Sequence, residues 1–281
     1  MTDGGTPNAA APMRDLGQRI ASGAALAIVV LVALWAGGLL FAIVVGAVGV
    51  VVTWEWGRVV RSAGVDAILI IQATAVIAGV LHAAWGLAGL GLIVVLVAAI
   101  ISALLAFGER GHMAALGALY AGLPAVALVW LHRGDSAGVL AVLFILLTVW
   151  ATDTGAYFAG RLIGGPKLAP NVSPNKTWSG LAGGVLAGSL VGVAFALARA
   201  ELAVGYMMAA GALLGVVSQA GDLLESALKR EYGVKDASTL IPGHGGFMDR
   251  TDGLVAAIIA SAIFAMVVDI HAPARALLGL N

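Results

Sequence analysis

The chain has 281 residues, of which 61% are hydrophobic and 11% charged, whereas about 25% of the residues in a soluble domain are charged. Its 15 basic and 15 acidic residues cancel without forming a basic stripe, so nucleic acid is excluded as a partner. Because the chain has no Cys, a disulfide framework, a thiolate metal site and a thiol nucleophile are excluded as well. We therefore expect an all-α, polytopic integral membrane protein that lies in the lipid bilayer.

Nine segments are apolar over about the 20 residues that a helix needs to cross a bilayer. They are residues 20–36, 38–55, 66–84, 87–106, 113–131, 137–155, 180–198, 203–221 and 253–270. Only Gly37 and Gly38 separate the first two, which leaves open a broken hairpin or one long span with a re-entrant piece. The first apolar run exceeds the roughly 7–15 residues of a signal-peptide core, so we expect a retained helix.

These spans divide the chain into three parts. Residues 1–19 predict a disordered cytoplasmic tail, residues 20–131 the N-terminal transmembrane helices, and residues 132–281 a C-terminal transmembrane catalytic region. With nine crossings, 12 of the 15 Lys and Arg residues fall on the side of the N-terminus. Since cytoplasmic loops are rich in Lys and Arg, we expect this face in the cytoplasm and the protein in a bacterial-type inner membrane.

Small residues recur at four-residue spacing in the later spans. Gly180, Gly184 and Gly188 follow this spacing in the seventh span, and Gly211 and Gly215 do so in the eighth. Glycines at this spacing allow helix backbones to approach closely in lipid, so we expect tight packing between these spans.

Two polar loops, at about residues 156–179 and 222–252, interrupt the apolar pattern on the predicted cytoplasmic face. Acidic and basic residues are dense in both loops and at the adjoining span ends, although the rest of the chain has few charges. Opposite charges at this density predict a site for an anionic substrate together with a divalent cation.

The first loop begins at Asp153, an acid at a span end that should face a polar cavity rather than lipid. Ser173 begins a turn, and Lys176 and Thr177 precede the next apolar span. Lys and Thr at a helix N-terminus suit anion binding, although Thr can also serve simply as a helix cap.

The second loop first continues the eighth span as a helix. Asp222, Glu225, Ser226 and Lys229 share one face of that helix, which is also typical of a solvated, salt-bridged surface. Three Gly and one Pro within residues 242–246 then leave backbone N–H groups open to a ligand.

Two carboxylates, Asp249 and Asp252, open the ninth span three residues apart. They point the same way on a helix and can bind Mg²⁺, which takes one or two carboxylates besides substrate phosphates and water. Either acid could also cap the helix.

Residues 226–252 resemble the signature of the phosphatidate cytidylyltransferases, with every fixed position filled. That pattern is Ser, Lys-Arg, four residues, Lys-Asp, then Pro-x-His-Gly-Gly and Asp-Arg-x-Asp. The first loop is similar to the family's second region, except for Ser179, where Glu or Gln often follows the Trp, so its role stays open.

The resemblance implies an enzyme that transfers CMP from CTP to phosphatidic acid, forming CDP-diacylglycerol and pyrophosphate. It implies a requirement for Mg²⁺ and leaves open a second, monovalent cation such as K⁺, as well as a homodimer. We expect Asp222, Asp249 and Asp252 to bind the metal. We expect five basic residues to bind phosphates: Lys176, Lys229, Arg230, Lys235 and Arg250.

The remaining candidates are assigned to catalysis or substrate contact. Asp236 and His244 are expected in the catalytic set, and His244 could instead only order its loop. Substrate contacts are expected from Asp153, Ser173, Thr177, Ser226, Gly245 and Gly246.

Three other functions compete with this interpretation. A CTP-dependent lipid or polyprenol kinase is the closest alternative. The Asp-Gly-x₂-Ala-Arg pattern of CDP-alcohol phosphotransferases is absent, because Leu-Val-Ala-Ala follows Gly253. A secondary transporter would carry ionisable residues near mid-membrane, whereas here the charges gather in loops of the C-terminal region.

Overall fold

The computed structural model describes residues 10–108, 111–133, 136–241 and 245–280, with side chains from Ser22 onward. This part of the chain is almost wholly helical. Its helices are α1 (Ala10–Ala36), α2 (Gly38–Arg61), α3 (Ala67–Ala84), α4 (Ala88–Leu105), α5 (Gly111–His132), α6 (Ser136–Leu162), α7 (Trp178–Ala198), α8 (Val204–Glu231), α9 (Met248–Val268) and α10 (Pro273–Leu278). The predicted polytopic helical fold is confirmed, since the eight helices α2 to α9 are long and apolar enough to cross a membrane.

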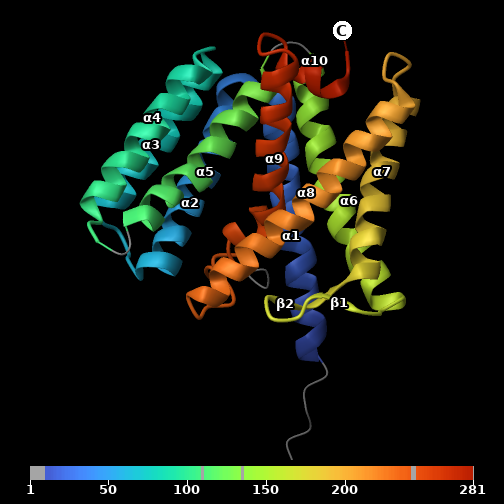
Figure 1. Cartoon of the computed structure of the whole chain (residues 1–281), viewed down its shortest axis with the longest axis horizontal. Coiled ribbons are helices and arrows are strands. Elements are labelled where there is room, and N and C mark those ends of the chain that lie inside the picture. The colour runs from blue at the N-terminus through green and yellow to red at the C-terminus, as the bar shows by residue number, and fades with distance from the viewer. Residues whose placement is uncertain (1–9, 109–110, 134–135, 242–244, 281) are drawn as a thin grey trace, which may run out of the picture.

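The first predicted span differs from the others. Its apolar part in α1, Ser22–Ala36, is shorter than a full span, so its crossing of the membrane stays a prediction. Gly37, with a φ of 64°, breaks the chain between α1 and α2, which meet at one end and diverge (Figure 1). Of residues 1–19, for which a disordered tail is expected, residues 10–19 belong to α1, and residues 1–9 lie outside the described part.

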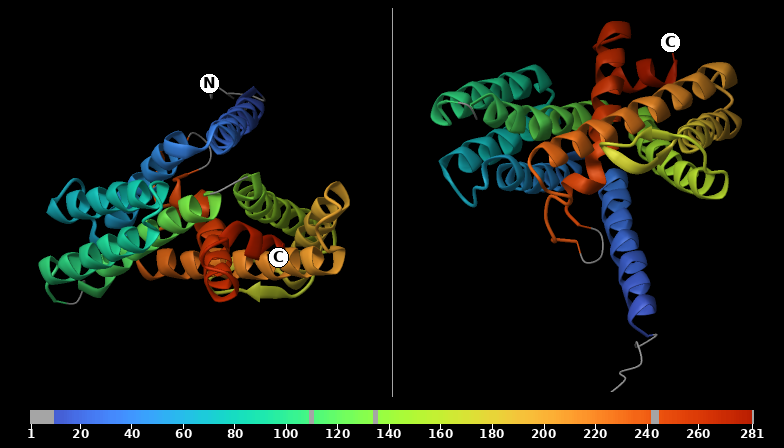
Figure 2. Two further views of the ribbon diagram at one scale, coloured as in Figure 1. Left: turned by 90° about the horizontal axis from the view of Figure 1, so that it is seen from above. Right: turned by 60° about the horizontal axis from the view of Figure 1, so that its bottom comes forward.

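The membrane helices form two bundles joined by α9. Helices α2 to α5 pack together as the N-terminal bundle, and α6 to α8 pack together as the C-terminal bundle. Helix α9 lies between them and contacts α2, α5, α6 and α8 (Figure 1). The apolar core runs through both bundles, from Phe41 and Val126 to Phe144 and Ile258. Helix α1 makes few contacts and projects away from the bundles (Figure 2).

Close approach of helices through small residues is confirmed. The buried residues of α7 are Gly180, Gly184, Gly188, Gly192 and Ala196. A Cβ atom added at Gly188 would lie 2.7 Å from the carbonyl oxygen of Gly211 in α8, closer than side-chain atoms pack. Larger residues at these positions would force α7 and α8 apart.

The first loop is shorter than expected because α6 runs past its apolar segment, and the helix predicted at the start of the second loop is present as the end of α8. Helix α6 continues to Leu162 and ends before Gly164 and Gly165, which both have positive φ. Helix α8 likewise continues to Glu231, before Gly233. Both loops emerge on the same side of the molecule, where they meet (Figure 1).

A small antiparallel sheet in the first loop departs from the all-α expectation. Strands β1 (Lys167–Ala169) and β2 (Ser173–Thr177) pair with Lys167 opposite Thr177 and Ala169 opposite Ser173. The segment follows two glycines and Pro166 and contains Pro174, so it cannot continue a helix. Its backbone groups are instead satisfied by pairing with each other.

Candidate functional site

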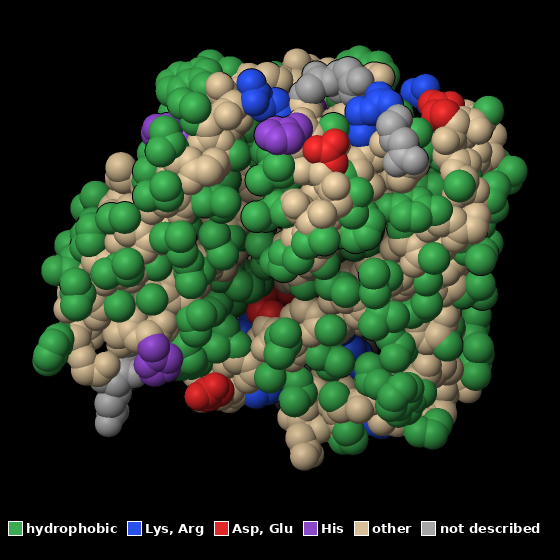
Figure 3. Space-filling view, turned by 45° about the horizontal axis from the view of Figure 1, so that its top comes forward, with side chains coloured by type: hydrophobic (Ala, Val, Ile, Leu, Met, Phe, Trp, Pro, Cys, Tyr) green, Lys and Arg blue, Asp and Glu red, His purple; other side chains and the backbone are tan. Residues whose placement is uncertain are grey.

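A cavity of about 1490 Å³ lies where the two loops meet the ends of α6, α8 and α9. Nine of the predicted site residues line it: Asp153, Lys176, Thr177, Asp222, Lys229, Asp236, Asp249, Arg250 and Asp252. From this polar end the cavity continues between apolar side chains of α1, α2, α5, α6 and α9. In Figure 3, acidic and basic side chains are visible in a recess between hydrophobic side chains.

Lys229 is buried between two carboxylates at the centre of the site. Its Nζ donates to Asp249 Oδ1 at 2.5 Å and lies 3.0 Å from Glu225 Oε1, one helical turn away. Tyr120 of α5 donates its hydroxyl to the other oxygen, Glu225 Oε2, at 2.6 Å. This chain of contacts fixes Lys229, and it keeps a buried ammonium compensated by opposite charge.

Asp249 also organises the backbone around it. Its Oδ2 accepts hydrogen bonds from the backbone N–H groups of Ala237 at 2.9 Å and Gly246 at 2.8 Å. Gly245, with a φ of 81°, has no room for a side chain, because a Cβ atom would lie 2.9 Å from this oxygen. Gly245 and Gly246 therefore pack tightly against the Asp249 carboxylate.

Three further carboxylates face the cavity beside this network. Asp252 lies within electrostatic reach of both Asp153 and Asp222. Lys176 of β2 forms an ion pair with Asp222, with 2.7 Å between Nζ and Oδ2, and joins the two loops. Arg250 and Lys176 both act on Asp153 with their positive charge. Acids from α6, α8 and α9 and bases from β2 and α9 thus surround one space.

The donor chemistry of this acidic group suits a hard divalent cation whose coordination is completed by a ligand. Among the described residues, no three acidic or His side chains are gathered closely enough to hold a metal by themselves. Mg²⁺ needs only one or two carboxylates when substrate phosphates and water supply the rest. Asp222 and Asp252 line the cavity and fit this partial donor set, with Asp222 also meeting Lys176 and Ser226. Asp249 is more fully engaged, because Lys229 meets one of its oxygens and two backbone N–H groups meet the other.

Several predicted residues lie next to the cavity rather than on its wall. Arg230 is exposed and donates to the carbonyl oxygens of Val172 and Val234 at 3.4 Å, so it ties the loops together. Ser226 donates to Asp222 Oδ1 at 3.3 Å. The other members of this group are Ser173 in β2, the exposed Lys235, and Gly245 and Gly246 in the turn. His244 lies outside the described residues.

Two residues of the first loop have structural contacts. Thr177 caps α7, since its Oγ1 accepts from the N–H of Gly180 at 3.0 Å, while its side chain also lines the cavity. Ser179, the departure from the family pattern, donates its hydroxyl to the carbonyl oxygen of Gly164. It therefore helps to close the turn between α6 and β1.

Glu55 of α2 is a site neighbour that the sequence motifs did not indicate. Its Oε1 accepts from Ser238 Oγ at 2.5 Å and from the N–H of Phe247 at 3.0 Å, and its Oε2 accepts from the N–H of Met248 at 2.6 Å. Tyr120 was missed in the same way. A carboxylate inside an apolar segment was the available signal for Glu55, because such residues are costly in a membrane and are usually functional.

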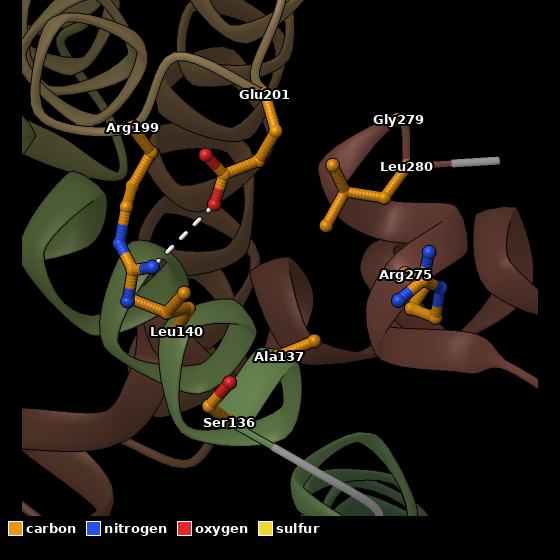
Figure 4. Close-up of a pocket in the computed structure, with 8 residues that line it drawn as sticks. All are labelled: Ser136, Ala137, Leu140, Arg199, Glu201, Arg275, Gly279 and Leu280. Atoms are coloured by element: carbon orange, nitrogen blue, oxygen red, sulfur yellow. Dashed lines mark hydrogen bonds and ion pairs between the residues drawn. The ribbon is translucent and has the colours of Figure 1, made fainter.

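A second cavity, of about 480 Å³, lies at the opposite end of α6, between its first turn, the α7–α8 connection and α10 (Figure 4). Arg199 and Glu201 form an ion pair there, with 3.4 Å between Nη1 and Oε1. None of the predicted site residues lines this cavity. The candidate site is therefore the larger cavity.

Comparison with known proteins finds one matching family profile and several similar proteins. The sequence profile of the Cytidylyltransferase family matches residues 17–268. A phosphatidate cytidylyltransferase of Brucella suis is 47% identical over 155 residues, 55% of this chain and 57% of the relative. One from Bacillus subtilis is 39% identical over 150 residues, 53% of this chain and 55% of the relative. The chain thus spans a little over half the length of these relatives.

Proposed function

We propose that this chain, which belongs to the cytidylyltransferase family, transfers CMP from CTP to phosphatidic acid. The products are CDP-diacylglycerol and pyrophosphate. The proposal depends on one observation: the charged end of the larger cavity is continuous with an apolar space between membrane helices. Such a cavity can hold a polyanionic nucleotide and the headgroup of a lipid whose chains stay among apolar side chains.

The reaction needs no strong general base. A phosphomonoester has its second pKa at about 6, so the attacking oxygen of phosphatidate is already anionic near neutral pH. This oxygen forms a bond to the α-phosphorus of CTP, and the bond from that phosphorus to the bridging oxygen of pyrophosphate breaks. Pyrophosphate leaves with the electron pair, so atoms and charge balance without an added proton donor.

The main task of the protein is to bring two polyanions together. Lys176 and Arg250 face the cavity and would bind phosphate oxygens. Lys229 has three N–H donors, of which two meet Asp249 and Glu225 and one remains for a phosphate. Positioned cations of this kind stabilise the charge that develops on a transferring phosphoryl group.

Asp222 and Asp252 would hold Mg²⁺, which when bound supplies further neutralisation of phosphate charge. The ion pair between Lys176 and Asp222 keeps that carboxylate at the cavity wall. Asp249, in turn, holds Lys229 and the turn at Gly246 in place. The charged residues of the cavity thus divide into two acids that bind Mg²⁺ and three bases that bind phosphate.

The orientation proposed for the chain follows from its charge distribution. With most Lys and Arg residues on the face of the two loops, the cavity opens to the cytoplasm, where CTP is available. The membrane would be the inner membrane of a bacterial cell.

The position of the label in CTP distinguishes this activity from a lipid kinase. Purified protein in phosphatidate-containing micelles is given CTP labelled at the α- or the γ-phosphate, with and without Mg²⁺. We expect the α-label in lipid and the γ-label in pyrophosphate, with Mg²⁺ only. Lipid labelled from the γ-position, or no labelled lipid at all, would contradict the proposal.

A further inference from the structure

The start of α9 lacks a cap from its own sequence. Phe247, the residue at the cap position, makes no side-chain capping hydrogen bond. The first N–H groups of a helix have no acceptor within the helix, and a negative charge is favoured beside them. Glu55, 193 residues before Met248, supplies that acceptor through the two backbone N–H groups described above.

The surroundings of Glu55 are built for this contact. Its side chain is fully buried. A Cβ atom at Gly246 would lie 2.8 Å from Glu55 Cδ and 2.9 Å from Oε2, so only Gly allows the carboxylate to come this close. Beside it, Trp56 and Val60 of α2 form a small apolar cluster with Ala237 and Met248. The described parts of the segment before α9, at residues 237–238 and 246–248, are therefore docked on α2 by both polar and apolar contacts.

The same segment is held from its other side by Asp249. Glu55 accepts hydrogen bonds from Ser238, Phe247 and Met248. Asp249 accepts hydrogen bonds from the backbone N–H groups of Ala237 and Gly246. Asp249 follows Met248 directly in the chain and carries the ion pair to Lys229. A shift of the segment on α2 would consequently move the Asp249 carboxylate and the ammonium that it orients.

We propose that Glu55 is a positioning residue of the cytidylyl-transfer site, acting on Asp249 and Lys229 through residues 237–238 and 246–248. This inference rests on the proposed function. Glu55 itself does not line the cavity. Its effect is expected on the rate of the bound complex, because misplacement of a catalytic group by about 1 Å costs up to about a hundredfold.

The test compares Glu55→Gln and Glu55→Ala with a control in the same helix. Gln keeps the shape and one acceptor oxygen but presents an NH₂ group to a backbone donor. Thr53→Val is the matched control, since Thr53 is equally buried and, among the described residues, its hydroxyl donates only to the carbonyl oxygen of Gly49 in α2. Folded, monodisperse protein is assayed for kcat and for KM toward both substrates.

We expect kcat to fall by about tenfold or more in Glu55→Gln and further in Glu55→Ala, with KM for phosphatidate little changed. Thr53→Val should keep the kcat of the unchanged protein. If Glu55→Gln loses thermal stability but keeps kcat, the residue is structural only and the inference is overturned. Should Glu55→Ala fail to fold, Glu55→Gln decides alone.

Hydrogen–deuterium exchange tests the positioning without using activity. In Glu55→Gln, peptides covering residues 237–250 should exchange faster, while peptides from the remainder of α9 should not change. Unchanged exchange at residues 237–250 would contradict the inference even if activity falls. If the unchanged protein makes no CDP-lipid, the proposed function fails, whereas the exchange result still decides whether Glu55 anchors the segment.

Discussion

The N-terminal and C-terminal bundles contribute differently to the cavity. The C-terminal bundle and α9 carry nearly all the charged residues of the site, from Asp153 to Asp252. The N-terminal bundle supplies apolar wall and two polar contacts, Glu55 to the segment before α9 and Tyr120 to Glu225. The comparison indicates that the charged groups of the cavity reside in one region, while contacts that hold them in place come from the other.

The largest effect is expected at Asp249, which contacts both Lys229 and the segment that Glu55 holds. Asp249→Asn removes the charge that fixes Lys229, and breaking a buried pair costs about 3–5 kcal/mol of stability. We expect CDP-lipid formation per folded protein to fall by on the order of a hundredfold or more. Asp269→Asn, at the exposed far end of α9, should leave the rate unchanged. Substantial activity of Asp249→Asn at saturating Mg²⁺ would remove Asp249 from the site.

At Asp252 we expect a large effect on the Mg²⁺ dependence of the rate. Asp252 belongs to the C-terminal region, so this change leaves the contacts of Glu55 and Tyr120 in place. Asp252→Asn should raise the Mg²⁺ concentration needed for half-maximal rate by about tenfold or more, because a neutral amide is a poorer ligand. Titration of the rate with Mg²⁺ measures this shift. Glu201→Gln, in the connection between α7 and α8, is the control. An unchanged Mg²⁺ dependence of Asp252→Asn would count against its role as a ligand.

Gly246→Ala tests the contact between the two regions directly. The added Cβ atom meets the Glu55 carboxylate, so the rate should fall by about tenfold, as expected for Glu55→Gln. Because both changes disturb the same contact, Gly246→Ala should cost much less when Glu55 is already Ala. Gly205→Ala, which has open space around it, is the control. Additive losses in the double variant would mean that the two residues act independently.

The smallest effect is expected at Tyr120. Tyr120→Phe leaves Glu225 without one donor and should lower the free energy of unfolding by about 1–3 kcal/mol, with a severalfold loss of rate. Tyr206→Phe offers a matched comparison, since its hydroxyl donates to the carbonyl oxygen of Leu277 at 3.0 Å, outside the site. It should lose stability without losing rate. If both variants keep full activity, Tyr120 belongs to the fold alone.

The sequence predicted the parts of the molecule that depend on local pattern. Apolar length gave the eight helices α2 to α9, and charge density located the two loops that meet at the cavity. The end of the sixth span was misjudged, because α6 continues into polar sequence to Leu162 before Gly164 and Gly165. The continuation of the eighth span as a helix through Lys229 was predicted, and α8 ends at Glu231.

Glu55 could not be paired with its partners from the sequence. Its hydrogen bonds cross 183 to 193 residues, and its acceptors are filled mainly by backbone N–H groups, which carry no residue-type signal. The occupied oxygens of Asp249 were hidden for the same reason, since two of its three partners are amides. Motifs therefore indicated many of the side chains that line the cavity but not the contacts that hold them.

The apolar extension of the cavity has a consequence for how the protein behaves outside a membrane. Its walls come from α1, α2, α5, α6 and α9, so a hydrocarbon chain lying there touches helices from both regions at once. Any lipid that binds the folded form in this space stabilises it by mass action. Membrane phospholipid would then bind the protein as a ligand besides surrounding it. The melting temperature of the protein in detergent should therefore rise with the mole fraction of added phospholipid.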